Sequence, residues 1–222
     1  MGVAVIVLGR SGSGKSASLR NFEPGEVGIL NVMSKPLPFR KKLESFDTCD
    51  YKTITDCIKS GKRRAWVVDD AGYLMQLQNF AMAKKKGYEK FVDIAYNFEQ
   101  LMVAATTAPE DTITYLMMHP EVDADGNEKI KTAGKMIDEK FGIEGAVPIL
   151  IECEVVDGKH VFVTENNGSN LAKAPVDIAS GERMLPPVMD NDLKAVDTAI
   201  RGFWGMKPLK DSPGKAANAV SE

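Results

Sequence analysis

The most informative feature of the sequence is a glycine-rich loop that ends in a lysine and a serine. Residues 9–16 read Gly-Arg-Ser-Gly-Ser-Gly-Lys-Ser, a complete phosphate-loop motif (P-loop) of the form G-x-x-x-x-G-K-S/T. Gly12 and Gly14 allow backbone N–H groups to turn toward a phosphate chain with no Cβ in the way. Lys15 supplies a positive charge at the β- and γ-phosphates, and Ser16 places its hydroxyl on Mg²⁺. These residue types predict a site for ATP and Mg²⁺.

The segments on either side of the P-loop support this interpretation. Val3 to Leu8 is a short apolar run rich in β-branched residues, which is typical of a fully buried strand. Residues 17–20 are compatible with the start of a helix, whose N-terminal partial positive charge favours a bound anion. Strand, loop and helix in this order are the context that confirms the motif. The predicted nucleotide-binding residues are Gly9, Arg10, Ser11, Gly12, Ser13, Gly14, Lys15, Ser16 and Ala17.

Two adjacent carboxylates follow a second buried run. Ala65 to Val68 is apolar, and Asp69 and Asp70 come directly after it. A phosphate-loop protein places its Mg²⁺-holding carboxylate at the end of a buried strand. We therefore expect Asp69 to hold the metal together with Ser16, and Asp70 to orient the attacking water. Two solvated turn carboxylates are the alternative interpretation.

His119 stands at the end of another predicted strand, over residues 112–118. Open parallel sheets bind ligands at the carboxyl ends of their strands, so a polar residue there is placed to sense the γ-phosphate. A histidine that simply begins a loop fits the spacing equally well. The predicted catalytic residues are Lys15, Asp70 and His119.

The composition restricts how the chain can bind nucleic acid. Its 222 residues carry a formal net charge of −3, so a DNA site must be a local patch. The run Lys84 to Lys86, with Tyr88 as a stacking surface, and a second stretch with Lys129 and Lys131 fit either DNA phosphates or a solvated surface. The three cysteines lack metal-binding spacing, which favours a reduced cytoplasmic protein. No apolar run reaches the length of a membrane span.

Strands that alternate with helices predict an α/β fold with a mostly parallel sheet flanked by helices. A further strand is expected over residues 26–32, and Asp157-Gly158 predicts a C-terminal antiparallel hairpin between residues 147–155 and 160–165. We expect one domain over residues 1–206 and a disordered tail over residues 207–222. Helices are expected over residues 40–43, 53–60, 71–83, 88–107 and 190–204.

The order of these features resembles the core of the RecA-type ATPases. In that family a P-loop, an acidic strand, a mobile loop, a polar sensor strand and a second mobile loop follow one another. The chain more closely resembles the phage-encoded RecA-like single-strand annealing proteins of the Sak group, over roughly residues 1–175. Besides the P-loop, the segments that resemble the RecA-type family are residues 132–135 and 161–167, and those that resemble the Sak group are residues 31–40, 68–71 and 134–138.

This resemblance implies a RecA-like P-loop NTPase core that binds ATP between subunits of a homo-oligomeric ring or filament. It implies that two mobile loops bind single-stranded DNA during phage recombination in the host cytoplasm, with a single-strand-binding protein as a further partner. The implied DNA contacts are Lys84, Lys85, Lys86, Lys129 and Lys131, and the implied contacts to a neighbour's γ-phosphate are Lys135 or Lys140.

One departure from the family bears on the rate of hydrolysis. RecA-type ATPases carry a catalytic glutamate just after their second strand, and residues 31–34 here read Asn-Val-Met-Ser. Slow ATP hydrolysis is therefore expected. A P-loop nucleotide or nucleoside kinase and an ATP-gated DNA motor or loader subunit are the alternatives, although residues 120–140 lack the arginines typical of a kinase lid.

Overall fold

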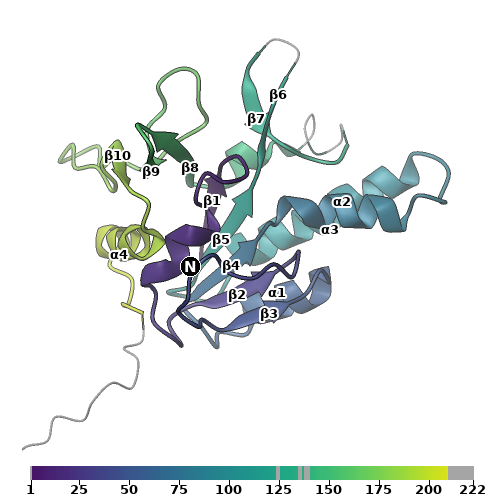
Figure 1. The fold of residues 1–222 in the computed structure, drawn as a ribbon, viewed down its shortest axis with the longest axis horizontal. Coiled ribbons are helices and arrows are strands. Elements are labelled where there is room, and N and C mark those ends of the chain that lie inside the picture. The colour runs from purple at the N-terminus through teal and green to yellow at the C-terminus, as the bar shows by residue number, and fades with distance from the viewer. Residues whose placement is uncertain (1, 124–125, 135–136, 138–140, 210–222) are drawn as a thin grey trace, which may run out of the picture.

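The computed structural model describes residues 2–123, 126–134, 137 and 141–209, and its centre is an eight-stranded sheet. The strands of this sheet are β1 (Val3–Leu8), β2 (Gly28–Asn31), β3 (Ser45–Asp47), β4 (Ala65–Asp69), β5 (Ile113–Met118), β8 (Ile149–Val156), β9 (Lys159–Val163) and β10 (Val188–Asp190). Their order is β10-β9-β8-β1-β5-β4-β2-β3 (Figure 1). β8, β1, β5, β4, β2 and β3 are parallel, and β9 and β10 continue the sheet antiparallel. The predicted fold class is confirmed.

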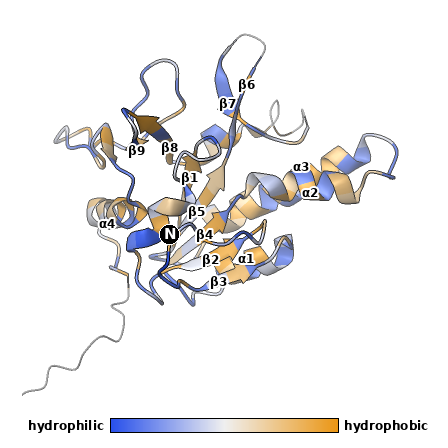
Figure 2. Ribbon diagram, viewed as in Figure 1, coloured by the Kyte–Doolittle hydropathy of each residue, from blue (hydrophilic) through white to orange (hydrophobic). Residues whose placement is uncertain are grey.

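Helices cover both faces of this sheet. They are η1 (Ser16–Asn21), α1 (Tyr51–Lys59), α2 (Gly72–Ala81), α3 (Glu89–Thr106), η3 (Ile143–Ala146) and α4 (Leu193–Trp204). One core forms between the sheet and α1, α2 and α3, and a second forms between the sheet and η1 and α4. Successive β1 side chains point to opposite faces, so Ile6 joins the first core and Val5 the second. A strand that is buried on both faces of the sheet therefore requires an unbroken apolar run. Figure 2 shows hydrophobic residues concentrated in the central strands.

The α2 and α3 helices pack against each other and project beyond the sheet (Figure 1). A small separate hairpin, β6 (Pro120–Val122) and β7 (Glu128–Ile130), follows β5. Among the described residues, no helix is long and apolar enough to cross a membrane.

The structure differs from the sequence prediction in its shortest elements. The helix expected after the P-loop is only η1, because Phe22 returns to an extended conformation and Pro24 follows two residues later. No helix forms over residues 40–43, which lie in bends and irregular chain. The other predicted helices are confirmed within a few residues, and the predicted hairpin is formed by β8 and β9. Most of the predicted tail, residues 210–222, lies outside the described residues.

Candidate nucleotide-binding site

The candidate site lies where the parallel strands of the central sheet end. β1, β5 and β4 run in the same direction, so Leu8, Met118 and Asp69 reach one edge of the sheet. The P-loop follows the first of these ends, His119 the second and Asp70 the third. Ligands of open α/β sheets bind at this edge. A cavity of about 340 Å³ opens there and is lined by P-loop residues, both carboxylates and the histidine.

The P-loop adopts a backbone that its glycines make possible. Gly12 and Gly14 have φ angles of +80° and +107°, values that favour glycine. A Cβ on Gly14 would lie 3.0 Å from the His160 ring, so a side chain there would also crowd its neighbour. Gly9, Arg10, Ser11 and Ser13 complete the loop, and Ala17 lies in the first turn of η1.

Lys15 is nearly fully buried under the loop that precedes it. Its Nζ donates hydrogen bonds to the carbonyl oxygens of Gly9, at 2.6 Å, and Arg10, at 3.2 Å. Burial lowers the pKa of the Lys15 ammonium, and the nearby charge of Asp70 opposes this. The ammonium therefore lies within the cavity, close to the backbone that would cradle a phosphate chain.

Ser16 and Asp69 form the predicted metal pair. The Ser16 hydroxyl lies 3.0 Å and 2.9 Å from the two carboxylate oxygens of Asp69. Burial raises the pKa of the Asp69 carboxyl, and the hydrogen bond from Ser16 opposes this. A hydroxyl beside a carboxylate at a phosphate site is the donor set that Mg²⁺ takes in P-loop proteins, with phosphate and water oxygens as its other ligands. Among the described residues, no group of three or more His, Cys, Asp or Glu side chains forms a metal site.

Asp70 is held on both of its carboxylate oxygens. Lys35 Nζ donates to Oδ2 at 2.7 Å, and His119 Nε2 lies 3.2 Å from Oδ1. Burial raises the pKa of the Asp70 carboxyl, but the hydrogen bonds from His119 and Lys35 outweigh burial and lower the pKa to about 2. Asp70 also has a φ of +64°, which is uncommon for a residue with a side chain. So held, the carboxylate is a weak base.

His119 connects this carboxylate to the P-loop lysine. Because an ionised carboxylate only accepts hydrogen bonds, the His119 Nε2–H must be the donor to Asp70. The other ring nitrogen, Nδ1, lies 3.5 Å from Lys15 Nζ. The predicted sensor position is therefore in contact with both the cation and the carboxylate of the site.

Five residues that line this cavity were not predicted: Lys35, Pro36, Pro38, Tyr73 and His160. Two of them, Lys35 and His160, contact predicted residues of the site. Lys35 comes from the loop after β2, and His160 comes from β9. Lys35 directly follows residues 31–34, where RecA-type ATPases carry an acid, and its charge is the sequence signal that marks it. His160 carries no sequence signal, because only the hairpin turn at residues 157–158 brings it back onto the P-loop.

The late strands brace the P-loop from one side. His160 Nδ1 lies 2.7 Å from the Ser13 carbonyl oxygen, and since a carbonyl only accepts, Nδ1–H donates. The Cys153 thiol donates to the same oxygen at 3.0 Å, and the Asn191 amide donates to the Cys153 sulfur. Arg20 then ties η1 to the Asn191 backbone at 2.6 Å. β8, β9 and the segment after β10 thus hold the loop's conformation.

A second cavity, of about 490 Å³, lies on the other side of the P-loop. Residues 9–13 line it, together with Glu128, Glu152 and Glu154. Burial raises the pKa of the Glu152 carboxyl to about 7; the hydrogen bond from the Leu171 N–H opposes this, and the charges of Glu128 and Glu154 add to it. This carboxyl is consequently only partly ionised at neutral pH.

The predicted DNA-binding lysines lie apart from the cavity of the P-loop. Lys84 to Lys86 connect α2 to α3 at the end of the projecting pair, where Lys85 forms an ion pair with Asp93 at 2.7 Å. Lys129 lies in β7 and pairs with Glu121, and Lys131 follows the strand. The segment predicted as a second loop is therefore the β6–β7 hairpin in part. Lys135 and Lys140 lie outside the described residues.

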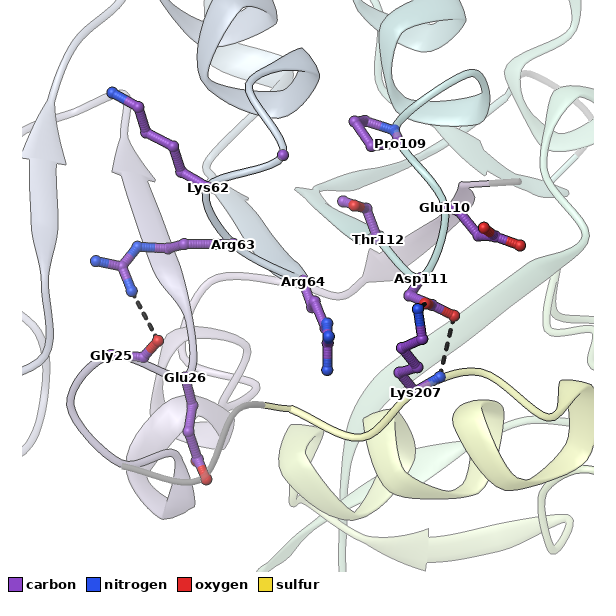
Figure 3. Close-up of a pocket in the computed structure, with 11 residues that line it drawn as sticks. Gly25, Glu26, Lys62, Arg63, Arg64, Pro109, Glu110, Asp111, Thr112 and Lys207 are labelled. Carbon is purple, nitrogen blue, oxygen red and sulfur yellow. Dashed lines mark hydrogen bonds and ion pairs between the residues drawn. The ribbon is translucent and has the colours of Figure 1, made fainter. Parts of the chain in front are cut away.

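A further pocket, of about 270 Å³, lies at the opposite edge of the sheet (Figure 3). Two of its cations are bound to neighbouring groups: Arg63 donates to the Gly25 carbonyl, and Lys207 pairs with Asp111 at 3.5 Å. The dashed contacts in Figure 3 join these same partners. Residues of the segments before β4 and before β5 line this pocket. It shares no residue with the candidate site.

Comparison with known proteins finds matches among solved structures. The sequence matches no protein-family model and no curated protein. Among solved structures, 69 chains match. One belongs to a "structural and biochemical analysis of a prototypical ATPase from the type III secretion system of pathogenic bacteria", with 14% sequence identity and a TM-score of 0.46. The match covers 69% of this chain and 51% of that one, so the chain spans about half the length of that ATPase. Function must therefore be argued from the site.

Proposed function

We propose that this protein is a RecA-like ATP-binding protein that binds single-stranded DNA and promotes annealing during phage recombination, with slow Mg²⁺-dependent ATP hydrolysis. The observation that carries the nucleotide part is the single cavity shared by Lys15, Ser16, Asp69 and His119. Each of these side chains comes from a different strand end or from the P-loop, and together they supply the cation, the metal ligands and a polar contact for a triphosphate.

The DNA part rests on the α2–α3 connection. The lysine run there is flanked by two aromatic residues, Phe80 and Tyr88, that are 77% and 62% exposed. A merely solvated charge run gives no reason for exposed aromatic rings beside it. Lysines for the phosphates and rings for the bases are the two components of a sequence-tolerant single-strand site. Oligomerisation with ATP between subunits and a single-strand-binding protein as partner belong to the same proposal.

The DNA part is tested by replacing Lys84 to Lys86 with alanine. Affinity for single-stranded DNA should fall, and the slope of log K against log salt should flatten by about 2 to 3 units, because each phosphate contact releases counterions. A matched control replaces Lys42, Lys59 and Lys62, three exposed lysines outside this segment, and should bind as the wild type does. Unchanged affinity and slope in the first variant would show that the run is only a solvated surface.

The rate of ATP hydrolysis tests the remaining part. Asp70 is a weak base while Lys35 and His119 hold it, and residues 31–34 contain no acid. Turnover should therefore lie below the ~10 s⁻¹ typical of enzymes. If the protein binds no single-stranded DNA even with ATP and Mg²⁺, and instead phosphorylates a nucleoside or nucleotide, the kinase alternative replaces this proposal.

A further inference from the structure

Lys35 is fixed in place by the strand that precedes it. The buried Asn31 side chain, at the end of β2, donates from Nδ2 to the Lys35 carbonyl at 2.8 Å and accepts the Lys35 N–H on Oδ1 at 3.2 Å. The turn between them passes through Ser34 with a φ of +52°. This pair of hydrogen bonds holds the Lys35 backbone from both sides, so the lysine starts from a defined point beside the cavity.

The Lys35 side chain is hydrogen-bonded to Asp70 and is also largely exposed to solvent. Its Nζ lies 2.7 Å from Asp70 Oδ2, and this hydrogen bond raises the pKa of the ammonium, which stays charged. The side chain is nonetheless 58% exposed, whereas Lys15 is almost fully buried. Lys35 can therefore change partner by rotating its own side chain, without unpacking the core.

The charges around the cavity indicate which group Lys35 would bind in place of Asp70. Asp69 and Asp70 both line it, and two carboxylates repel an incoming phosphate chain. Lys35 offsets one of these charges and lines the same cavity as Lys15. The last phosphate of ATP carries more charge than a carboxylate and presents three oxygens, so it competes well for an exposed ammonium.

We propose that Lys35 is a second phosphate-binding cation that contacts the terminal phosphate of ATP from within the same chain, and that this contact releases Asp70 Oδ2. The inference rests on the proposed ATP binding and adds to it a means of distinguishing ATP from ADP. It also assigns the loop after β2 a role in nucleotide selection in place of a catalytic acid.

The test compares the affinities of ATP and ADP in the Lys35→Met variant, which keeps an unbranched side chain one atom shorter and removes its charge. Calorimetric titration with Mg²⁺ is used, with a slowly hydrolysed ATP analogue in place of ATP. Affinity for the analogue should fall about tenfold or more, and affinity for ADP should change less than threefold. Lys41→Met is the matched control, because Lys41 pairs with Glu23 outside the cavity; it should bind both nucleotides as the wild type does.

The Lys35→Met/Asp70→Asn double variant separates a phosphate contact from simple charge neutralisation. If Lys35 contacts the terminal phosphate, the double variant still fails to prefer the ATP analogue. Recovery of the wild-type preference in the double variant would mean that Lys35 only screens Asp70, and the phosphate contact would be refuted. An unchanged preference in Lys35→Met alone refutes it as well. A wild-type protein that binds neither nucleotide overturns the proposed function itself, which the wild-type titration reveals before any variant is measured.

Discussion

Replacement of Glu152 by glutamine should stabilise the protein above neutral pH and have little effect in mild acid. Glu152 is 4% exposed and lies in β8 beside the P-loop. Burial raises the pKa of its carboxyl to about 7; the hydrogen bond from the Leu171 N–H, at 2.6 Å, opposes the increase, and the charges of Glu128 and Glu154 add to it. Glutamine retains an oxygen to accept that N–H and cannot ionise.

The sign and size of the effect follow from proton linkage. Between pH 4.5, the ordinary pKa of a glutamate side chain, and pH 7, the unfolded chain releases a proton that the folded protein keeps. Stability of the wild type therefore falls as pH rises through this window, and the loss is complete above the folded pKa. Each pH unit of that window is worth about 1.4 kcal/mol, so the total lies between about 3 and about 4 kcal/mol. The Glu152→Gln variant does not lose stability in this way, because glutamine does not ionise.

The assay is denaturant-induced unfolding at pH 5 and pH 8. The free energy of unfolding of Glu152→Gln relative to the wild type should increase by about 2–3 kcal/mol from the lower to the higher pH. Glu154→Gln removes the same charge two residues along the strand at a partly exposed position, and it should show a pH-dependent difference of less than about 1 kcal/mol. The reasoning is refuted if the difference between Glu152→Gln and the wild type is the same at both pH values.

Three other predictions concern the P-loop, the carboxylate pair and a buried ion pair. Lys15→Ala should abolish tight ATP binding while the circular dichroism spectrum is retained, and calorimetry showing unchanged ATP affinity would contradict the role given to Lys15. Asp69→Asn should weaken Mg²⁺-dependent nucleotide binding more than Asp70→Asn does, and the reverse order would exchange the two assignments. Arg201→Met leaves Asp197, which is fully buried, without its ion-pair partner, so the free energy of unfolding should fall by about 3–5 kcal/mol in a denaturant titration; a loss below 1 kcal/mol would show that the site relaxes.

The central part of the candidate site could be predicted because its residues follow strong local signals. The P-loop motif fixes residue types at fixed spacing, and the buried strands before it and before Asp69 are continuous apolar runs. His119 follows a third such strand. Since parallel strands bring their carboxyl ends to one edge, three independent sequence signals predicted one location.

The rest of the site depends on contacts between distant segments, which no local pattern encodes. Lys35 meets Asp70 because β2 pairs with β4, and His160 meets the P-loop because β9 folds back along β8. β3 and β10 have three residues each and are mostly exposed, so neither shows the periodicity or the apolar run that predicts a strand. Their placement follows from the strands beside them rather than from their own sequence.

The arrangement of the cavity also bears on how strongly a nucleotide can bind. Lys15 donates to two carbonyl oxygens, the Ser16 hydroxyl donates to Asp69, and Lys35 is paired with Asp70. Each of these side chains already has a protein partner, so its binding to a phosphate or a metal exchanges one hydrogen bond or ion pair for another. The net affinity from each group is then the difference between two contacts and is smaller than either contact alone. Removal of a competing partner, as in Asp70→Asn, should therefore free Lys35 and strengthen the preference for ATP over ADP, even though it removes a residue of the site.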